Sequence, residues 1–209
     1  MTMKKILITG AAGFIGSHLA ESLIKLGHSV LGIDNFSNGK KENIDYLKSC
    51  ENSNLFSFIE GDLRDVNFCN EIVTDIEVIY HQAALGSVPR SMNEPQLYFD
   101  NNLGGMVNLL EASRQSSIER FIFASSSSVY GDTPILPKVE TMPLNPKSPY
   151  AASKAAGEQY LKVYQDSFGL ETIGFRYFNV FGPRQDPFSQ YAAVIPRFFD
   201  QVLSNKPIT

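Results

Sequence analysis

The sequence predicts an α/β fold built on a doubly wound parallel sheet, with helices on both faces. Short apolar runs alternate along the chain with longer segments that have the spacing of amphipathic helices. This alternation is typical of parallel sheets, in which crossover helices join the strands. In addition, a polar or glycine motif follows each apolar run, and such folds bind ligands at the carboxyl ends of their strands. The prediction depends on the agreement of these two patterns along the whole chain.

The first predicted strand, Lys5–Thr9, leads into three glycines that open a helix. Gly10, Gly13 and Gly16 have the spacing GxxGxxG, and the helical pattern of Phe14–Leu26 overlaps their end. Glycine permits a tight turn and lets the backbone approach a pyrophosphate, which the free N–H groups and the dipole of the helix then bind. The segment therefore predicts a dinucleotide site of the Rossmann type.

The second predicted strand, Ser29–Ile33, ends in an acidic residue, Asp34, which lies 18 residues after Gly16. A carboxylate at this place accepts a hydrogen bond from the ribose 2′-hydroxyl of NAD and repels the 2′-phosphate of NADP. We therefore expect NAD as the cofactor. The structural alternative is a plain glycine turn with a solvated aspartate, and the order of strand, glycines and acid disfavours it.

The remaining elements continue the alternation. Further strands are expected at Leu55–Glu60, Val78–His81, Arg120–Ser125 and Thr172–Arg176. Further helices are expected at Val66–Val73, Glu94–Ser116, Pro149–Phe168 and Ala192–Leu203, and Lys40–Ser49 fits another short helix. The motif residues after the strands are Gly10, Asp34, Asp62, Ala83, Ser126 and Asn179. Because parallel strands end at one edge of the sheet, these residues are expected to gather there.

One of these helices is predicted to carry an acid/base pair. Tyr150 and Lys154 lie four residues apart, so both side chains occupy one face of the helix. A free tyrosine has a pKa of about 10, and a nearby ammonium lowers it because it favours the phenolate. A hydroxyl such as that of Ser126 can hydrogen-bond the same substrate oxygen. Together these groups can take a proton from a carbinol oxygen or return it.

The composition limits the classes of function. The chain has 209 residues, of which 43% are hydrophobic, so it can bury one sizeable core. Its formal charge of −4 comes without a basic run, which argues against nucleic acid as a partner. We expect no membrane span and no secretory signal, and Cys50 and Cys69 fit a reducing cytoplasm. We expect no metal site, and His18, His28 and His81 are interpreted as structural.

Motifs along the whole chain resemble one family. They are Gly10/Gly13/Gly16, Gly61–Asp65, His81–Ala84, Asn101–Asn102, Ser126 with Val129–Gly131, Tyr150/Lys154 and Arg176–Gly182. These motifs are similar to those of the extended short-chain dehydrogenase/reductases that act on nucleotide sugars, the NAD-dependent epimerase/dehydratase family. Three segments, His81–Ser91, Tyr177–Asp186 and Tyr191–Pro196, look like those of the UDP-N-acetylglucosamine 4-epimerases of bacterial surface polysaccharide synthesis.

The resemblance implies a role for each matching residue. The catalytic residues would be Tyr150 as acid/base, Lys154 as the group that lowers its pKa and bonds the nicotinamide ribose, and Ser126 on the sugar 4-hydroxyl. The implied cofactor-binding residues are Gly10, Gly13, Phe14, Ile15, Gly16, Asp34, Asn35, Asp62, Leu63, Ala83, Ala84, Asn102, Tyr150, Lys154 and Tyr177. The implied substrate-binding residues are Ser87, Val88, Arg90, Ser126, Ser127, Tyr150, Asn179, Val194, Ile195 and Pro196.

The reaction that the resemblance implies is redox-neutral. Tyr150 would remove the proton of the sugar 4-hydroxyl while C4 passes a hydride to tightly bound NAD⁺. The 4-keto sugar would then turn, and the hydride and the proton would return on its other face. The protein supplies position and acidity, whereas the hydride chemistry belongs to the cofactor. The resemblance also implies a UDP-sugar partner and a homodimer that forms through the helices Glu94–Ser116 and Pro149–Phe168.

Members of the family continue beyond the point at which this chain ends. We therefore expect residues 1–176 to form the NAD-binding domain. Residues 177–209 would begin a substrate-binding region whose C-terminal lobe is missing. Substrate binding and turnover would be weak in such a fragment.

Other functions stay open at this point. Epimerases of UDP-glucose or UDP-glucuronate share the motifs. The motifs do not distinguish these enzymes, because they do not define the pocket for the substituent at C2 of the sugar. A nucleotide-sugar dehydratase shares the fold and the pair Tyr150/Lys154. That group typically places Asp-Glu after its catalytic hydroxyl, where this chain has Ser127 and Ser128. An inactive fragment that only binds NAD is the alternative outside the enzymes.

Overall fold

The computed structural model describes residues 2–185 and 194–207, and a six-stranded sheet forms its centre. The strands are β1 (Lys5–Thr9), β2 (Ser29–Asp34), β3 (Phe56–Glu60), β4 (Val78–His81), β5 (Arg120–Ser126) and β6 (Glu171–Tyr177). Their order in the sheet is β3-β2-β1-β4-β5-β6, and neighbouring strands are parallel. The strand order reverses between β1 and β4, which is where doubly wound folds bind their ligands. The predicted fold class is confirmed.

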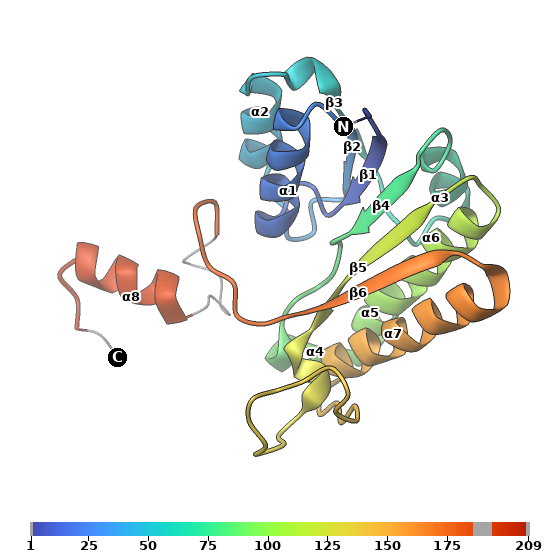
Figure 1. Ribbon diagram of the computed structural model, residues 1–209. Helices are drawn as coiled ribbons and strands as arrows, with labels where there is room; N and C mark the ends of the chain where they lie inside the picture. Colours follow the sequence, from blue (N-terminus) through green and yellow to red (C-terminus); the bar gives the residue numbers. More distant parts are fainter. Residues whose placement is uncertain (1, 186–193, 208–209) are drawn as a thin grey trace.

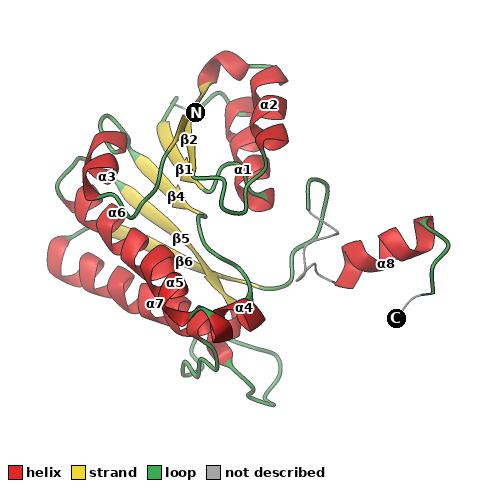
Figure 2. Ribbon diagram, turned by 180° about the vertical axis from the view of Figure 1, so that it is seen from behind, coloured by secondary structure: helices red, strands yellow, loops and turns green. Residues whose placement is uncertain are grey.

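Helices cover both faces of the sheet (Figures 1 and 2). On one face lie α1 (Phe14–Lys25) and α2 (Lys41–Ser49), and on the other lie α3 (Val66–Ile72), α6 (Gly105–Arg114) and α7 (Pro149–Phe168). The shorter segments are η1 (Ser53–Leu55), α4 (Val88–Asn93), α5 (Pro95–Tyr98), the π-helical η2 (Phe99–Gly104) and η3 (Ser127–Tyr130). A last helix, α8 (Val194–Leu203), lies apart from the α/β body in both views.

The observed strands differ from the predicted ones by at most one residue at either end. Among the helices, the predicted bounds of Pro149–Phe168 are those observed, and the short helix expected at Lys40–Ser49 is α2. Of the expected helix Ala192–Leu203, the part from Val194 onward is α8, and Ala192 lies outside the described residues.

The single helix predicted for Glu94–Ser116 is wrong. The backbone of Glu94 has φ −128° and ψ 55°, which is not helical, and Pro95 starts a new helix after it. A π-helical turn then replaces the α-helix from Phe99 to Gly104. An inserted turn of this type rotates the side chains that it carries, and here it includes Asn102, which bonds a neighbouring loop. The short helix α4 was not predicted; the Ser87 side chain caps it.

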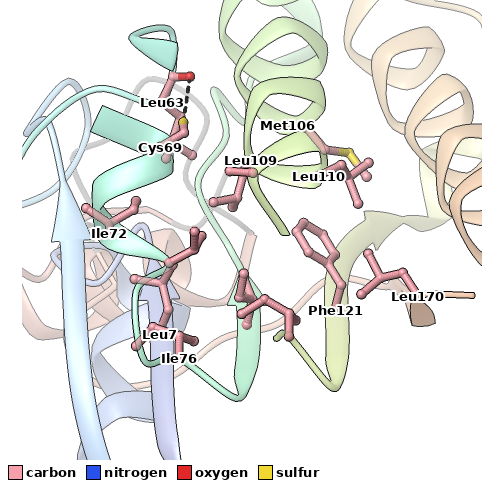
Figure 3. Packing of buried hydrophobic residues seen from close by; sticks show 14 of the residues in the cluster. Leu7, Leu63, Cys69, Ile72, Ile76, Met106, Leu109, Leu110, Phe121 and Leu170 are labelled. Carbon is pink, nitrogen blue, oxygen red and sulfur yellow. Dashed lines mark hydrogen bonds between the residues drawn. The ribbon is translucent and has the colours of Figure 1, made fainter. Parts of the chain in front are cut away.

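The core consists of two hydrophobic clusters, one on each face of the sheet. The larger cluster joins β1, β4 and β5 to α3, α6 and α7, and includes Leu7, Met106, Leu109 and Phe121 (Figure 3). In the same view, the Cys69 thiol donates a hydrogen bond to the Leu63 carbonyl at 3.3 Å. The smaller cluster packs α1 and α2 against β1 and β2. Close packing on both faces fixes the carboxyl ends of the strands, where the candidate site lies.

A helix needs about 20 consecutive apolar residues to span a bilayer. None of the described helices could cross a membrane.

Candidate active site

A cleft of about 120 Å³ opens at the carboxyl edge of the sheet, where β1 and β4 separate. Eight of the residues predicted to bind the cofactor line it: Gly10, Gly13, Asp34, Asn35, Asp62, Leu63, Ala83 and Ala84. They come from four different strand ends, so four of the six motif residues expected to gather at this edge, Gly10, Asp34, Asp62 and Ala83, line one cleft. Ser126 and Asn179 do not line it. The cleft therefore lies at the place predicted for a dinucleotide.

The glycine turn at the base of the cleft has no room for larger side chains. Gly10 has φ +72°, and a Cβ on it would lie 2.8 Å from the backbone nitrogen of Ala83. A Cβ on Gly16 would lie 2.1 Å from the Gly10 carbonyl oxygen. Phe14 and Ile15 begin α1, so their N–H groups, like that of Gly16, precede the first bonds within the helix. This turn presents backbone donors closely enough to bind a pyrophosphate.

The Asp34 carboxylate lies at the end of β2 and is almost completely buried. One oxygen accepts the Ala12 N–H at 3.0 Å and the other accepts the Phe36 N–H at 2.8 Å. Burial raises the pKa of Asp34, and these backbone bonds partly offset that effect. A carboxylate has about four lone-pair sites, so Asp34 can accept a further donor. The geometry therefore fits a carboxylate that accepts a ribose hydroxyl.

Asp62, after β3, is already paired within the protein. Arg64 donates to both carboxylate oxygens, at 3.0 Å from Nε and 2.7 Å from Nη2. The side-chain amide of Asn35 also donates to it, at 2.9 Å. The Arg64 guanidinium is the main reason why the pKa of Asp62 falls to about 2. Asp62 and Asn35 thus form one polar wall of the cleft, next to Asp34.

The loop after β4 is held by Asn102, which is buried on the π-helical turn η2. Its side-chain oxygen accepts the Leu85 N–H at 2.8 Å, and its side-chain nitrogen donates to the Leu85 carbonyl at 3.0 Å. A longer contact of 3.3 Å joins the same nitrogen to Ser153 Oγ on α7. Asn102, which was predicted to bind the cofactor, does not line the cleft; it fixes the loop that does.

The predicted catalytic residues Ser126 and Tyr150 are neighbours, close enough for Ser126 to affect the pKa of Tyr150. Ser126 Oγ accepts two bonds from Ser128, at 3.2 Å from the backbone N–H and 2.9 Å from the side-chain hydroxyl. Burial raises the pKa of Tyr150, and the neighbouring Ser126 hydroxyl partly offsets that effect. Tyr150 therefore lies beside Ser126, at the end of β5, with a hydroxyl that is harder to deprotonate than that of a free tyrosine.

Lys154 lies one turn after Tyr150 and is completely enclosed. Its ammonium donates to the Ala124 carbonyl at 2.7 Å and lies 4.8 Å from the centre of the Phe123 ring. Burial lowers the pKa of Lys154 to about 7. The expected lowering of the Tyr150 pKa by Lys154 is not what this arrangement produces, since burial dominates at both residues.

The predicted substrate residues occupy three places. Ser87, Val88 and Arg90 lie at the start of α4, where Ser87 Oγ accepts the Arg90 N–H at 3.0 Å and Arg90 pairs with Glu94. Ser127 opens η3, Tyr177 ends β6, and Asn179 follows it as an exposed residue. Val194, Ile195 and Pro196 begin α8; Ile195 is partly exposed, and the side chains of Val194 and Pro196 lie outside the described residues.

Several residues that line the cleft were not predicted. They are Thr9, Ile33, Ser37, Asn38, Gly39, Gly61, Gln82, Leu85 and Asn101. Thr9 ends β1 and Gln82 directly follows β4. Their positions at strand ends would have been enough to predict that both residues line the cleft. Ser37 to Gly39 follow no strand directly, so the sequence gives no such signal for them. Their closeness to the cleft shows only in the folded chain, where a Cβ on Gly39 would meet the Asp34 carboxylate.

Comparison with known proteins agrees with this geometry. The model of the NAD dependent epimerase/dehydratase family matches residues 6–209, which is nearly the whole chain. The chain belongs to the NAD dependent epimerase/dehydratase family. The family predicted from the motifs is thus confirmed, and NAD, the predicted cofactor, is the one that the family is described by.

Individual members of this family are similar to the chain at more than 40% identity. The UDP-glucose 4-epimerase of Mycolicibacterium smegmatis is 42% identical over 97% of this chain and 64% of its own length. A UDP-N-acetylglucosamine 4-epimerase from Methanobrevibacter ruminantium, solved with UDP-N-acetylmuramic acid, has a TM-score of 0.92 at 44% identity, over 99% of this chain and 64% of its own. The UDP-glucose 4-epimerase of Thermus thermophilus, solved with NAD, has a TM-score of 0.87 at 43% identity, over 98% and 64%. The chain thus spans slightly less than two thirds of these relatives.

Proposed function

We propose that the chain is the cofactor-binding and catalytic part of a UDP-sugar 4-epimerase. Residues 1–176 would form the NAD-binding domain, and residues 177–209 would begin the substrate-binding region. The observation that carries the proposal is the grouping of Ser126, at the end of β5, with Tyr150 and Lys154, on the first turns of α7. Because β5 is parallel to its neighbours, Ser126 lies at the same carboxyl edge of the sheet as the nucleotide cleft. The epimerase relatives, which are 42 to 44% identical, support the reaction class.

The residues of the cleft fit NAD. The space that a Cβ on Gly10 or Gly16 would fill is the close approach that a pyrophosphate needs. Asp34 would accept the adenosine ribose hydroxyl, and its charge would oppose the 2′-phosphate of NADP. Asp62 and Asn35 would bound the adenine end. When bound, NAD would supply the redox chemistry at C4 of the sugar.

The chain's own groups would handle the proton. Ser126 would hold the sugar 4-hydroxyl oxygen beside the Tyr150 hydroxyl. Tyr150, as a base, would take the proton from that oxygen and later return it. Lys154 has a pKa of about 7, so it can be charged or neutral near neutral pH, and its charged form would favour the tyrosinate that the reaction needs. Lys154 is buried, whereas Tyr150 is only partly buried, so a substrate can reach its hydroxyl.

For the substrate we propose UDP-N-acetylglucosamine, which would be converted into UDP-N-acetylgalactosamine. The segments His81–Ser91, Tyr177–Asp186 and Tyr191–Pro196 support this choice by their resemblance. So does the relative of TM-score 0.92, which is a UDP-N-acetylglucosamine 4-epimerase. UDP-glucose is the substrate that the names of two other relatives imply, and the assay below compares the two sugars.

We further propose a cytoplasmic homodimer. Apolar side chains stand exposed on the two helical segments expected at the interface: Phe99 on η2, and Tyr160, Val163 and Phe168 on α7. Burying such side chains against a second copy of the same helices would remove them from water. The two cysteines are free thiols, as is usual in a reducing compartment.

The test is proton NMR of the chain incubated with NAD⁺ and UDP-N-acetylglucosamine, or with UDP-glucose under the same conditions. The anomeric signal of the galacto-configured product should grow, and more quickly with the acetamido sugar. Tyr150→Phe removes one hydroxyl from the site, so it should retain NAD while the product signal disappears. An equal rate in Tyr150→Phe would refute the proposed chemistry. A parent chain that holds NAD without turnover would confine its function to cofactor binding.

A further inference from the structure

Gln82 lines the cleft and carries a side-chain amide that has no part in the proposed function. It follows β4 directly, and its backbone N–H donates to the Thr9 carbonyl at 3.2 Å. Its backbone also lies against the glycine turn, because a Cβ on Gly10 would meet the Gln82 carbonyl carbon at 3.0 Å. The main chain of Gln82 is therefore fixed, and the residue lines the cleft.

The side-chain amide of Gln82 is buried without a proper partner. Neither Oε1 nor Nε2 has a hydrogen bond of normal geometry in the part of the chain that the structure describes. One polar neighbour is the Tyr177 hydroxyl, whose pKa the Gln82 amide lowers against the larger effect of burial. Buried amides normally have their donor and acceptor satisfied, and leaving them unpaired costs stability.

A second amide near the site shows the contrast. Asn102 makes two bonds to Leu85 and a longer one to Ser153, so its oxygen and its nitrogen are both used inside the protein. Asn102 thus has a structural role that needs no ligand. Gln82 has no equivalent role, and its unpaired donor and acceptor lie in the wall of a ligand cleft.

The sheet order assigns Gln82 to one half of the cleft. Asp34 and Asp62 follow β2 and β3, on one side of β1. Gln82 follows β4 on the opposite side, towards β5 and β6, which end in Ser126 and Tyr177. A dinucleotide that places its adenosine beside Asp34 must extend its reacting end across β4 to reach the catalytic hydroxyls. The group that passes Gln82 therefore belongs to the nicotinamide half.

We propose that the Gln82 side chain binds the carboxamide of the nicotinamide ring through an amide-to-amide hydrogen-bonded pair. This inference rests on the proposed NAD binding and adds a contact to it. A carboxamide offers one acceptor oxygen and two N–H donors, which is the complement of what Gln82 leaves unpaired. Gln82 would thereby orient the ring whose face exchanges the hydride, next to Tyr177. It is a positioning residue for the reaction and a binding residue for the cofactor.

The test compares NAD⁺ with ADP-ribose, which lacks only the nicotinamide base. Binding of each to the nucleotide-free chain would be measured by isothermal titration calorimetry for the parent and for Gln82→Leu. We expect Gln82→Leu to weaken NAD⁺ about tenfold and to change ADP-ribose by less than about twofold. Asp34→Asn is the matched control: it acts on the adenosine half and should weaken both ligands by the same factor.

Two further readouts separate a ligand contact from a packing role. An NAD analogue with an acetyl group in place of the carboxamide should bind the parent more weakly than NAD⁺, and Gln82→Leu should no longer tell the two apart. Since leucine replaces an amide that has no partner, Gln82→Leu should also be at least as resistant to heat as the parent when free of nucleotide. A packing role predicts a lower melting temperature instead.

Each outcome decides the proposal. Equal changes for NAD⁺ and ADP-ribose in Gln82→Leu, or none for either, would overturn the contact. If the parent binds the two ligands equally well, the base makes no contact, and the proposal fails while the cofactor site stands. If the parent binds neither ligand, the proposed NAD function of this chain fails, and the Gln82 contact with it.

Discussion

The Arg176 guanidinium makes a bidentate ion pair with the Glu158 carboxylate, at 3.0 Å from Nε and 2.8 Å from Nη2. The Ser125 hydroxyl donates to the same carboxylate at 2.5 Å. Glu158 lies on α7, two turns after Tyr150, whereas Ser125 and Arg176 lie near the ends of β5 and β6. One carboxylate thus joins β5 and α7, which carry the proposed catalytic residues, to β6, which ends in Tyr177.

Removing the charge of Glu158 should lower the stability of the fold. In Glu158→Gln the Arg176 guanidinium, whose side chain is 17% exposed, loses its charged partner. Breaking a buried pair costs about 3–5 kcal/mol, and the partial exposure here reduces the expected loss to about 2 kcal/mol. Urea unfolding followed by circular dichroism would measure the difference.

The control is an exposed pair on the same helix. Lys162 and Asp166 form an ion pair at 2.6 Å, with side chains that are 71% and 55% exposed. Lys162→Gln should therefore change the free energy of unfolding by less than about 0.5 kcal/mol. Similar losses in Lys162→Gln and Glu158→Gln would show that the Arg176 pair makes no special contribution.

Local patterns were sufficient to predict the strands and the cofactor end of the site. Each strand is an apolar run bounded by polar residues. Because the strands are parallel, a motif that follows a strand in the sequence lies at the carboxyl edge of the sheet. Asp34 and the glycine turn belong to this group, because neighbours in the sequence determine their positions. The family resemblance added the roles of the residues to this frame.

The features that the sequence did not predict depend on contacts between distant segments. The helix pattern from Glu94 onward gives no sign of the π-helical turn, which places Asn102 against Leu85. The depressed pKa of Lys154 arises from burial, which residue spacing does not reveal. Gln82 lies within the motif His81–Ala84, and its unpaired amide becomes visible only when β4, β5 and β6 are assembled in the sheet.

Gly16→Ala should damage the glycine turn. The new Cβ would lie 2.1 Å from the Gly10 carbonyl oxygen, and backbone atoms cannot move aside as a flexible side chain can. We expect a loss of about 2 kcal/mol in unfolding free energy, within the range for overpacked sites, and weaker NAD binding. Thermal unfolding and calorimetric titration would measure the two effects.

Gly86→Ala is the comparison for this substitution. A Cβ on Gly86 has no neighbour within 4 Å, although the residue lies in the loop beside the cleft. Its effect on stability should stay within about 0.5 kcal/mol. If Gly86→Ala and Gly16→Ala were equally harmful, loss of backbone freedom rather than the close contact would be the cause.

Asp34→Asn should change the choice between NAD and NADP. The substitution keeps the size of the side chain and removes the charge that would repel a 2′-phosphate. We expect NAD affinity to fall about tenfold and the preference for NAD over NADP to narrow, as measured by competition with a fluorescent nucleotide. Asp62→Asn, which alters the Arg64 pair instead, should change both affinities by the same factor. An unchanged preference in Asp34→Asn would place the ribose elsewhere.

The depressed pKa of Lys154 should make stability depend on pH in one particular window. The pKa is about 7 in the folded chain, against an ordinary value of 10.5. Between these values the unfolded state binds more protons, so the free energy of unfolding should rise with pH by up to about 1.4 kcal/mol per unit. Below pH of about 7 both states are protonated and the effect ends.

Lys154→Met should lack this rise, and the difference between the two chains isolates Lys154 from the other groups that titrate in this window. The measurement is urea unfolding of both chains at a series of pH values. If the free energies of unfolding of the parent and of Lys154→Met change with pH in parallel, the enclosed ammonium keeps its ordinary pKa, because the Ala124 carbonyl and the Phe123 ring stabilise its charge.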